Sequence, residues 1–400
     1  MFRLTKFLSE IDNPTPVGVR RDPPGPVVIW NLIRRCNLTC KHCYAISADK
    51  DFPGELSLEQ IFAVMDDLKT FRVPALILSG GEPLLRPDIY EISRQAKSLG
   101  FYAGLSTNGT LIDETRIDEI ADIGYDYVGV SIDGMADTHD KFRRLEGAFD
   151  KSMEGVRLCR EKGLKVGLRF TMTQDNAAEL GDMLDLLDQE NIDRFYFSHL
   201  NYAGRGNHNR KDDAIFQMTR NAMDMLFERC LEGIRKGETK EFVTGNNDAD
   251  GVYLLKWIEK NYPDHAEHMR AKLVQWGGNA SGVNVANIDN VGEVHPDTMW
   301  WHYGLGNVKD RPFSEIWQDT SDPLMAGLKS RPRPLKGRCA ACCHVDICGG
   351  NTRVRADQIT GDPWAEDPAC YLDDDEIGID ENSATGRIKM TPFSASRKAG

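Results

Sequence analysis

Three cysteines near the start of the chain have the spacing of a metal-cluster site. Cys36, Cys40 and Cys43 stand in the run RCNLTCKHCY. Three thiolates can hold a four-iron cluster and leave one iron without a protein ligand, which a small molecule can then occupy. A zinc site is the alternative, with His42 or His199 as the fourth ligand. The three-cysteine spacing favours the cluster, and an open iron favours catalysis over storage.

A second group of cysteines lies near the end of the chain. Four thiolates can fill every iron of a four-iron cluster and leave no site for substrate. A structural zinc site is again the alternative. Because Cys342 and Cys343 are adjacent, one of them is spare, and we expect Cys343 to be the spare one. The predicted ligands of this second site are Cys339, Cys342, Cys348 and Cys370.

Size and composition limit what the chain can be. Its 400 residues suit one large domain and a smaller one, and its net charge of −13 argues against nucleic acid as a partner. It contains no apolar run long enough to span a membrane and no signal-peptide pattern at residues 1–12. Ten cysteines in a chain of this kind indicate thiols or metal ligands rather than disulfides. We therefore expect a cytoplasmic protein without a nucleic-acid or membrane partner.

The elements that position the first cysteine group follow a regular alternation. Short apolar runs rich in β-branched residues are separated by amphipathic helical patterns, which is typical of parallel β/α units. Six such units are too few for a closed eight-stranded barrel. The sequence therefore predicts an α/β fold with a partial (β/α)6 TIM-type barrel, whose active face lies at the carboxyl ends of the strands. The expected strands are 27–32, 75–78, 101–106, 127–132, 166–172 and 195–200.

Composition changes along the chain suggest five segments. Residues 1–25 are Pro- and Arg-rich and are expected to be irregular, whereas 26–212 form the barrel. Residues 213–274 are expected to be a helical linker. Residues 275–379 are loop-rich, contain the second cysteine group and should form a small iron–sulfur domain. Residues 380–400 have the composition of a disordered tail.

Four loops of the expected barrel resemble those of radical S-adenosylmethionine (SAM) enzymes. The cysteine loop is followed, in order, by Gly80-Gly81-Glu82-Pro83, by Ser106-Thr107-Asn108-Gly109 and by Val130-Ser131-Ile132-Asp133-Gly134. The resemblance covers about residues 26–200 and implies that SAM chelates the open iron. An ordinary strand-to-helix turn would also use the two glycines, and capping would explain Ser131.

The same resemblance assigns roles to single residues. It implies that Gly80, Gly81 and Glu82 meet the methionyl amine of SAM. It places Ser106, Asn108 and Ser131 at the ribose and carboxylate, with Arg143 and Arg169 as looser candidates for the carboxylate. His42 stands where that family often has a larger aromatic residue beside the adenine.

The end of the chain resembles the SPASM extension of radical SAM enzymes. In that extension the second cysteine group holds an auxiliary cluster. Full SPASM domains hold two auxiliary clusters, but Asp297 and Thr352 stand here where further cysteines are expected. The resemblance therefore implies two [4Fe–4S] clusters in total, one that binds SAM and one auxiliary.

Over nearly its whole length the chain resembles the radical SAM enzymes of haem d1 biosynthesis. This implies an iron tetrapyrrole substrate, a didecarboxylated sirohaem, which loses two propionate side chains in exchange for oxo groups. It also implies a flavodoxin- or ferredoxin-type electron donor. The alternatives are a related enzyme that decarboxylates another iron tetrapyrrole, a peptide-maturing SPASM enzyme, and a non-enzymatic electron carrier or zinc scaffold.

Such a substrate would need cationic partners for its carboxylates and could take an axial ligand on its iron. His199 ends the sixth expected strand and is predicted to point toward the cavity, although a hydrogen-bonded structural role is the commoner one for such a residue. The other histidine candidates are His208, His295 and His302, and the arginine candidates are Arg20, Arg21, Arg34, Arg35, Arg86, Arg205 and Arg210.

Overall fold

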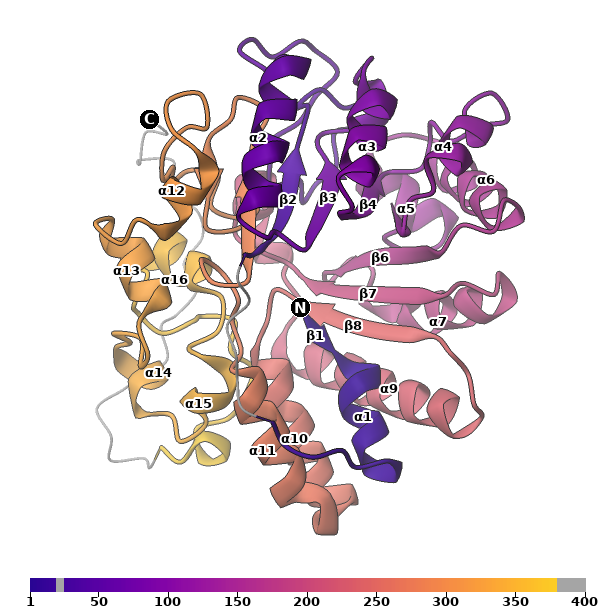
Figure 1. Ribbon diagram of the computed structural model, residues 1–400. Coiled ribbons are helices and arrows are strands. Elements are labelled where there is room, and N and C mark those ends of the chain that lie inside the picture. The colour runs from indigo at the N-terminus through magenta and orange to yellow at the C-terminus, as the bar shows by residue number, and fades with distance from the viewer. Residues whose placement is uncertain (19–24, 380–400) are drawn as a thin grey trace.

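The computed structural model describes residues 1–18 and 25–379, which form a curled sheet flanked by helices (Figure 1). Arg20, Arg21 and the tail expected at 380–400 lie outside the described residues. The sheet has ten strands in the order β1-β8-β7-β6-β5-β4-β3-β2-β9-β10. The pairings from β8 through β2 to β9 are parallel, and the two outermost pairings are antiparallel. The strands are β1 (Phe2–Arg3), β2 (Val27–Asn31), β3 (Ala75–Ser79), β4 (Tyr102–Thr107), β5 (Tyr127–Ser131), β6 (Val166–Met172), β7 (Arg194–His199), β8 (Glu241–Gly245), β9 (Val285–Ile288) and β10 (Val294–His295).

The central strands confirm the expected open barrel, because β2 to β7 coincide with the six predicted strands to within a residue or so. Helices cover the outer face of the sheet (Figure 1). Those of the barrel are α2 (Leu58–Thr70), α3 (Ile89–Ser98), α4 (Ile117–Ile123), α5 (Ala136–Arg143), α6 (Ala148–Glu161), α7 (Leu180–Gln189) and α8 (Gly204–His208).

The N-terminal segment is more ordered than expected. Residues 1–25 begin with β1 and with α1 (Leu4–Asp12), where an irregular segment was predicted. Leu4, Phe7, Leu8 and Ile11 recur at helical spacing and are buried. The helix packs on α9 (Phe216–Arg235), so burial of this apolar stripe decides its structure.

The region after the barrel also contributes strands. Residues 213–274 are mainly helical, with α9, α10 (Ala249–Asn261) and α11 (Ala266–Trp276), but they also contain β8, which the sequence analysis did not foresee. β9 and β10 come from the C-terminal region and extend the opposite edge of the sheet. The C-terminal helices lie beside that edge (Figure 1). They are α12 (Phe313–Gln318), α13 (Pro323–Lys329), α14 (Gly337–Ala341), α15 (Val345–Cys348) and α16 (Arg353–Thr360).

The two faces of the sheet differ in chemistry. One set of alternating side chains, such as Leu168, Phe170, Phe195 and Phe197, is buried beneath the helices. The other set lies on the concave face and is smaller or more polar.

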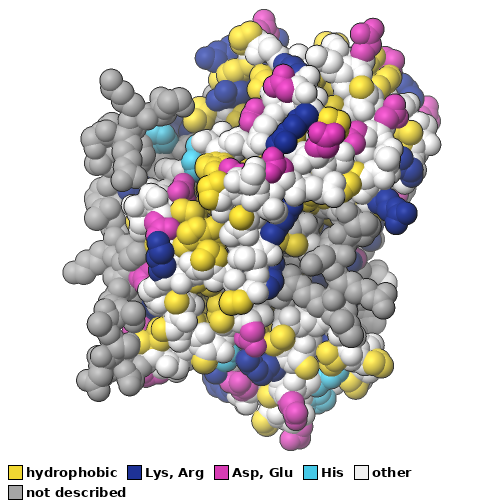
Figure 2. All heavy atoms as spheres, turned by 60° about the vertical axis from the view of Figure 1, so that its left-hand side comes forward, with side chains coloured by type: hydrophobic (Ala, Val, Ile, Leu, Met, Phe, Trp, Pro, Cys, Tyr) yellow, Lys and Arg dark blue, Asp and Glu magenta, His cyan; other side chains and the backbone are white. Residues whose placement is uncertain are grey.

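The side of the molecule shown in Figure 2 carries Lys and Arg side chains close to Asp and Glu side chains, with hydrophobic groups between them. Within residues 1–18 and 25–379, no helix is both long and apolar enough to cross a membrane.

Candidate functional site

The concave face brings together three of the expected SAM-binding side chains. Ser131 on β5 lies opposite Arg169 on β6, and Ser106 on β4 lies opposite Gly129. Arg169 donates a hydrogen bond to Ser106, and its guanidinium lies 5.3 Å from the ring centroid of Tyr196. A Cβ atom on Gly129 would lie 3.1 Å from Cδ of Arg169. The glycine therefore leaves the arginine room to cross the intervening strand.

The first cysteine group lies in the loop after β2, at the carboxyl ends of the strands. Cys36 and Cys40 are buried and pack against Leu38. Each of the three sulfurs accepts a hydrogen bond from nitrogen. The donors are Leu38 N to Cys36 (3.4 Å), a guanidinium nitrogen of Arg143 to Cys40 (3.5 Å) and Ser47 N to Cys43 (3.4 Å).

These contacts suit a metal cluster. Burial raises the pKa of the Cys36 and Cys40 thiols, because the protein interior solvates a thiolate poorly. Hydrogen bonds from N–H groups favour the thiolate form, and a bound metal supplies positive charge that offsets the cost of burying a thiolate. The donor set therefore fits an iron cluster held by three cysteines.

The loop after β3 packs tightly on the start of the cysteine loop. Gly81 N donates to Ile33 O at 2.6 Å, and Glu82 N donates to Arg35 O at 2.9 Å. A Cβ atom on Gly80 would lie 2.6 Å from Ile33 O, and one on Gly81 would lie 2.2 Å from Arg35 O. The two glycines are thus required by the close approach of two loops, which an ordinary turn would not need.

Glu82 connects this loop to the next one. Its side chain is fully buried, and its carboxylate accepts hydrogen bonds from Leu84 N (3.2 Å), Thr107 Oγ1 (2.8 Å) and Asn108 N (2.8 Å). Burial raises the pKa of Glu82 to about 7. The carboxylate therefore ties the loop after β3 to the end of β4.

Asn108 extends the connection to the cysteines. Its Nδ2 donates to Asn37 Oδ1 at 2.9 Å and lies 3.9 Å from Cys36 Sγ. Its Oδ1 accepts from both the backbone and the hydroxyl of Thr110. Three of the four loops that the resemblance singled out thus form one hydrogen-bonded unit around Cys36.

The fourth loop reaches Cys40 through a buried ion pair. Arg143 on α5 pairs with Asp133, which follows β5, and also donates to Cys40. Both side chains of the pair are buried. The structure thus places Arg143 against a cluster ligand and its own counter-ion.

His139 lies behind this ion pair and makes stability depend on pH. Its Nδ1 accepts a hydrogen bond from Asp133 N at 3.0 Å, and burial lowers its pKa to about 4. The unfolded chain takes up this proton near pH 6.5, so the contribution to stability is complete above pH 6.5 and is lost as the pH falls toward 4. We expect the free energy of unfolding to fall by roughly 3 kcal/mol across that window.

His139→Asn keeps a hydrogen-bond acceptor for Asp133 N but removes the titrating ring. It should flatten the dependence of the free energy of unfolding on pH, measured by urea unfolding at pH 4 to 7.5, with His265→Asn as control. An unchanged slope in His139→Asn would contradict the assignment.

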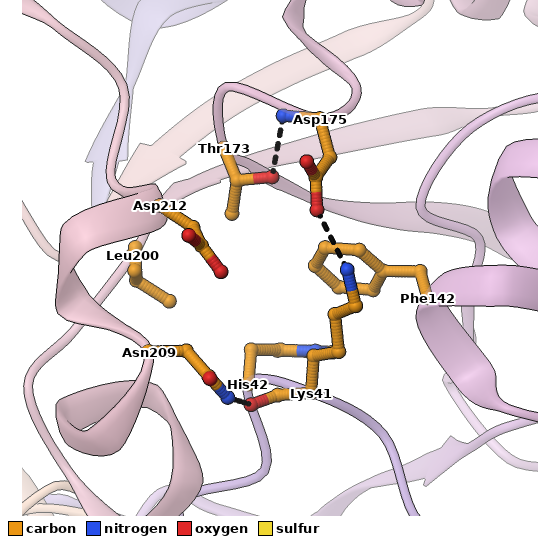
Figure 3. A pocket seen from close by; sticks show the side chains of 8 residues that line it. All are labelled: Lys41, His42, Phe142, Thr173, Asp175, Leu200, Asn209 and Asp212. Atoms are coloured by element: carbon orange, nitrogen blue, oxygen red, sulfur yellow. Dashed lines mark hydrogen bonds and ion pairs between the residues drawn. The ribbon is translucent and has the colours of Figure 1, made fainter.

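A small pocket lies beside the cysteine loop (Figure 3). It is lined by His42 and Phe142, whose ring centroids are 4.7 Å apart, and by Leu200 and several polar side chains. Lys41 pairs with Asp175 across its mouth at 2.9 Å. Burial lowers the pKa of His42 to about 4, so its ring is a neutral, flat surface at neutral pH.

The second cysteine group surrounds a single cavity. All four predicted ligands line it: Cys339, Cys342, Cys348 and Cys370. Among residues 1–18 and 25–379, no three Cys, His, Asp or Glu side chains are grouped closely enough to hold a single metal ion. All four thiols line one cavity, and four cysteines around one space fit a four-iron cluster.

The neighbouring positions support the choice of ligands. Cys343 is exposed and does not line the cavity. Its backbone N donates to Ile377 O at 3.0 Å. Asp297, which stands where a cysteine was expected, accepts from Met299 N at 2.7 Å. Thr352, at the other such position, donates to Asn246 O at 3.1 Å. Both residues thus make ordinary hydrogen bonds, Asp297 within its own turn and Thr352 with the loop after β8.

His199 does not point toward the concave face, so that prediction was wrong. It shares the covered face of β7 with Phe197, is 5% exposed, and its Nε2 lies 3.0 Å from Asp250. Asp250 also accepts from Thr244 and Tyr371. His199 belongs to a buried structural network, because strand alternation puts it on the same side as the phenylalanines.

The remaining histidine and arginine candidates have varied surroundings. Nδ1 of His295 on β10 lies 2.8 Å from Tyr303 O, and Nε2 of His302 lies 2.9 Å from Asp357. Arg86 is buried and donates hydrogen bonds to the backbone oxygens of Leu32 and Leu56. Arg35 forms an ion pair with exposed Asp49. His208 lies on α8 and Arg210 directly after it, and Arg34 lies over the ring of Phe52.

Arg205 has a structural role that sequence reasoning missed. Its guanidinium donates to Cys40 O (2.7 Å) and Ser47 O (3.0 Å), and so braces the cysteine loop from α8. Nothing in the sequence connects α8 with that loop. Only the fold brings them together.

The chain is similar to known proteins over most of its length. Residues 30–187 match the model of the radical SAM superfamily. The chain is 54% identical to the pre-heme d1 synthase of Dinoroseobacter shibae, with 99% of this chain and 98% of that protein covered. It is 46% identical to the Fe-coproporphyrin III synthase of Methanosarcina barkeri, covering 89% and 90%. The structure of Streptococcus suis SuiB bound to S-adenosylmethionine superposes with a TM-score of 0.68 at 17% identity, covering 87% of this chain and 77% of that one.

Proposed function

Because the chain belongs to the radical SAM superfamily and is an enzyme, we propose that it acts on an iron tetrapyrrole in haem d1 biosynthesis. The proposed reaction removes two propionate side chains from a didecarboxylated sirohaem and leaves oxo groups in their place. The observation that carries this proposal is the 54% identity over almost the full length of a pre-heme d1 synthase. An identity of this size over nearly the whole of both chains makes a shared substrate class the simplest explanation.

The residues of the N-terminal site have distinct tasks in this proposal. Membership of the superfamily implies a [4Fe–4S] cluster and SAM, which together supply a 5′-deoxyadenosyl radical able to take a hydrogen atom from the substrate. Cys36, Cys40 and Cys43 would hold the cluster. Glu82 and Asn108 would fix the loops that contact SAM, as their hydrogen bonds to neighbouring loops indicate. Arg143 would neutralise the ligand Cys40.

The concave face would receive the remainder of SAM. Ser106, Ser131 and Arg169 lie together there, and the hydroxyls and guanidinium suit the ribose and carboxylate groups. His42 and Phe142 offer flat surfaces beside the cysteine loop for the adenine. The backbone of Gly80 and Gly81 would meet the methionyl amine.

We further propose that Cys339, Cys342, Cys348 and Cys370 hold an auxiliary [4Fe–4S] cluster, and that a flavodoxin- or ferredoxin-type protein delivers electrons. The cavity that these four thiols share supports the auxiliary cluster. The second candidate function is trimming or decarboxylation of another iron tetrapyrrole, which the 46% identity to an Fe-coproporphyrin III synthase favours.

The reaction can be tested by product mass. The enzyme, reconstituted anaerobically, would be incubated with SAM, dithionite and candidate iron tetrapyrroles, and the products analysed by mass spectrometry. Loss of two propionate groups from didecarboxylated sirohaem is the expected result. Loss of other side chains would favour the second candidate. Cleavage of SAM without change in any tetrapyrrole would refute both.

The auxiliary site is tested by replacing Cys339 and Cys342 together with alanine. Because the N-terminal site is separate, we expect SAM cleavage to persist within about twofold while product formation falls by at least about tenfold, as expected for loss of a dedicated redox partner. High-performance liquid chromatography of 5′-deoxyadenosine and of the product measures the two effects separately. Equal loss of both activities would show that the cysteines serve the general fold.

A further inference from the structure

Two arginines donate hydrogen bonds to cysteine sulfurs of the second site. Arg338 donates to Cys370 Sγ at 3.3 Å, and Arg353 donates to Cys339 Sγ at 3.8 Å. Both side chains are buried, Arg353 completely. Neither residue was singled out by the sequence, and nothing in the proposed function uses them.

The surroundings of Arg353 are unusual for a buried guanidinium. Its other acceptors are the backbone oxygens of Asn351, Pro363 and Ala365, and no carboxylate of the described residues forms an ion pair with it. Arg355 lies two residues further along the same helix and is equally buried, but it is held by both oxygens of Asp367. Asp362 interacts electrostatically with Arg353 but forms no ion pair with it. A buried cation without an ion-paired carboxylate is costly, so Arg353 indicates that an anion belongs beside it.

A third arginine has a similar environment. Arg333 is buried and donates to Asn279 and to Gly349 O, the residue after Cys348. No carboxylate within residues 1–18 and 25–379 forms an ion pair with it either. Arg338, in contrast, shares its charge with Asp374 at 2.6 Å. Two cations thus face the thiols: Arg338 lines the cavity and has Asp374 as counter-ion, and Arg353 reaches Cys339 without an ion-paired carboxylate.

We propose that Arg353 and Arg338 bind the negative charge of the auxiliary cluster and make it easier to reduce. This inference rests on the proposed auxiliary cluster. With four thiolates, a cluster core of two positive charges carries two negative charges overall, and reduction by one electron makes three. No bond forms or breaks and no proton is needed. The buried cations stabilise the more negative state, and N–H···S hydrogen bonds act in the same direction.

The consequence is a direction of electron flow. A cluster with a raised reduction potential accepts one electron from a substrate radical more readily than it delivers an electron to SAM. Hydrogen bonds also join the region around the cavity to the barrel. Asn351 accepts from Asp248 N at 2.6 Å, and Arg355 donates to Leu200 O at 3.4 Å. The auxiliary site is therefore attached to the loops after β7 and β8.

The test uses the full chain with Cys36, Cys40 and Cys43 replaced by alanine, so that the auxiliary cluster can be titrated alone. The midpoint potential would be measured with dithionite and mediators, following the reduced cluster by electron paramagnetic resonance. Arg353→Gln should shift the reduction equilibrium at least tenfold toward the oxidised cluster, which is 59 mV more negative for a one-electron couple. Arg353→Lys, which keeps the charge, should restore most of the potential. Arg355→Lys is the matched control on the same helix and should leave it unchanged.

The outcomes separate this inference from the proposed function. A cluster-containing Arg353→Gln protein with an unchanged midpoint would overturn the inference and leave the auxiliary cluster in place. Absence of iron and of a reduced-cluster signal in the parent protein would instead overturn the auxiliary cluster itself. Should Arg353→Gln lose its cluster, Arg338→Gln carries the same test, with a smaller expected shift because Asp374 already offsets part of its charge.

Discussion

Replacing Cys36, Cys40 and Cys43 together by alanine is expected to abolish formation of 5′-deoxyadenosine from SAM. The three thiols are the only protein groups proposed to hold the SAM-binding cluster, and without it SAM has no electron source. About half of the iron should remain, since a second four-iron site is proposed elsewhere in the chain. Anaerobic reconstitution, iron analysis and chromatography of the nucleoside product measure both effects.

The matched control for this change is Cys343→Ala. Cys343 is exposed and lies outside the cavity that the other four C-terminal cysteines line. Iron content and SAM cleavage should therefore equal those of the unaltered enzyme. Persistent 5′-deoxyadenosine formation in the triple variant would remove the basis of the proposed function, and loss of iron in the control would move the auxiliary ligand from Cys342 to Cys343.

Gly81→Ala is the single substitution expected to damage the SAM site most. The new Cβ atom would lie 2.2 Å from Arg35 O and 2.5 Å from Arg34 O, so the loop after β3 must separate from the cysteine loop. Backbone atoms cannot yield as a flexible side chain can, and overpacking of this kind costs about 1–3 kcal/mol or more. We expect SAM affinity to fall by at least about tenfold, because about 1.4 kcal/mol corresponds to a factor of ten.

Gly181→Ala provides the comparison. Gly181 lies on α7, and a Cβ atom there would have no neighbour within 4 Å. Its SAM affinity should match the parent, with stability unchanged or raised by up to about 1 kcal/mol, since alanine favours helix. Isothermal titration calorimetry with SAM and urea unfolding measure the two quantities. Equal SAM affinity in both variants would show that the close loop contact has no part in binding.

The central fold could be predicted because each barrel strand has a recognisable local sequence pattern. A run such as Val166–Met172 is apolar, β-rich and bounded by helical patterns, so period and composition agree. β8, β9 and β10 have two to five residues each. β8 pairs with β1 and β9 with β2, which are far away in the sequence, and among the described residues β10 pairs only with β9, so no local pattern reveals them. α1 was missed because the prolines that follow it dominate the composition of residues 1–25, although its apolar stripe was present in the sequence.

The site shows the same division between local pattern and tertiary contact. The resemblance of the four loops to radical SAM enzymes indicated the site residues, and the structure adds the hydrogen bonds that join Glu82, Asn108 and Cys36. The direction of His199 was predicted wrongly although the signal was available, since Phe195, Phe197 and His199 alternate with Tyr196 and Ser198. The arginines beside the second cysteine group carry no recognisable motif. The role of Arg353 depends on its having no ion-paired carboxylate among the described residues, which a sequence does not reveal.

The pairing of β2 with β9 has a consequence for biosynthesis of the chain. Val27 pairs with Val285, so the first barrel strand acquires its outer neighbour only after most of the polypeptide has left the ribosome. Until then β2 is an unprotected edge next to the nascent cysteine loop, and loop closure across so many residues is slow. Truncation before β9 is therefore expected to yield aggregating protein rather than an independently folding barrel.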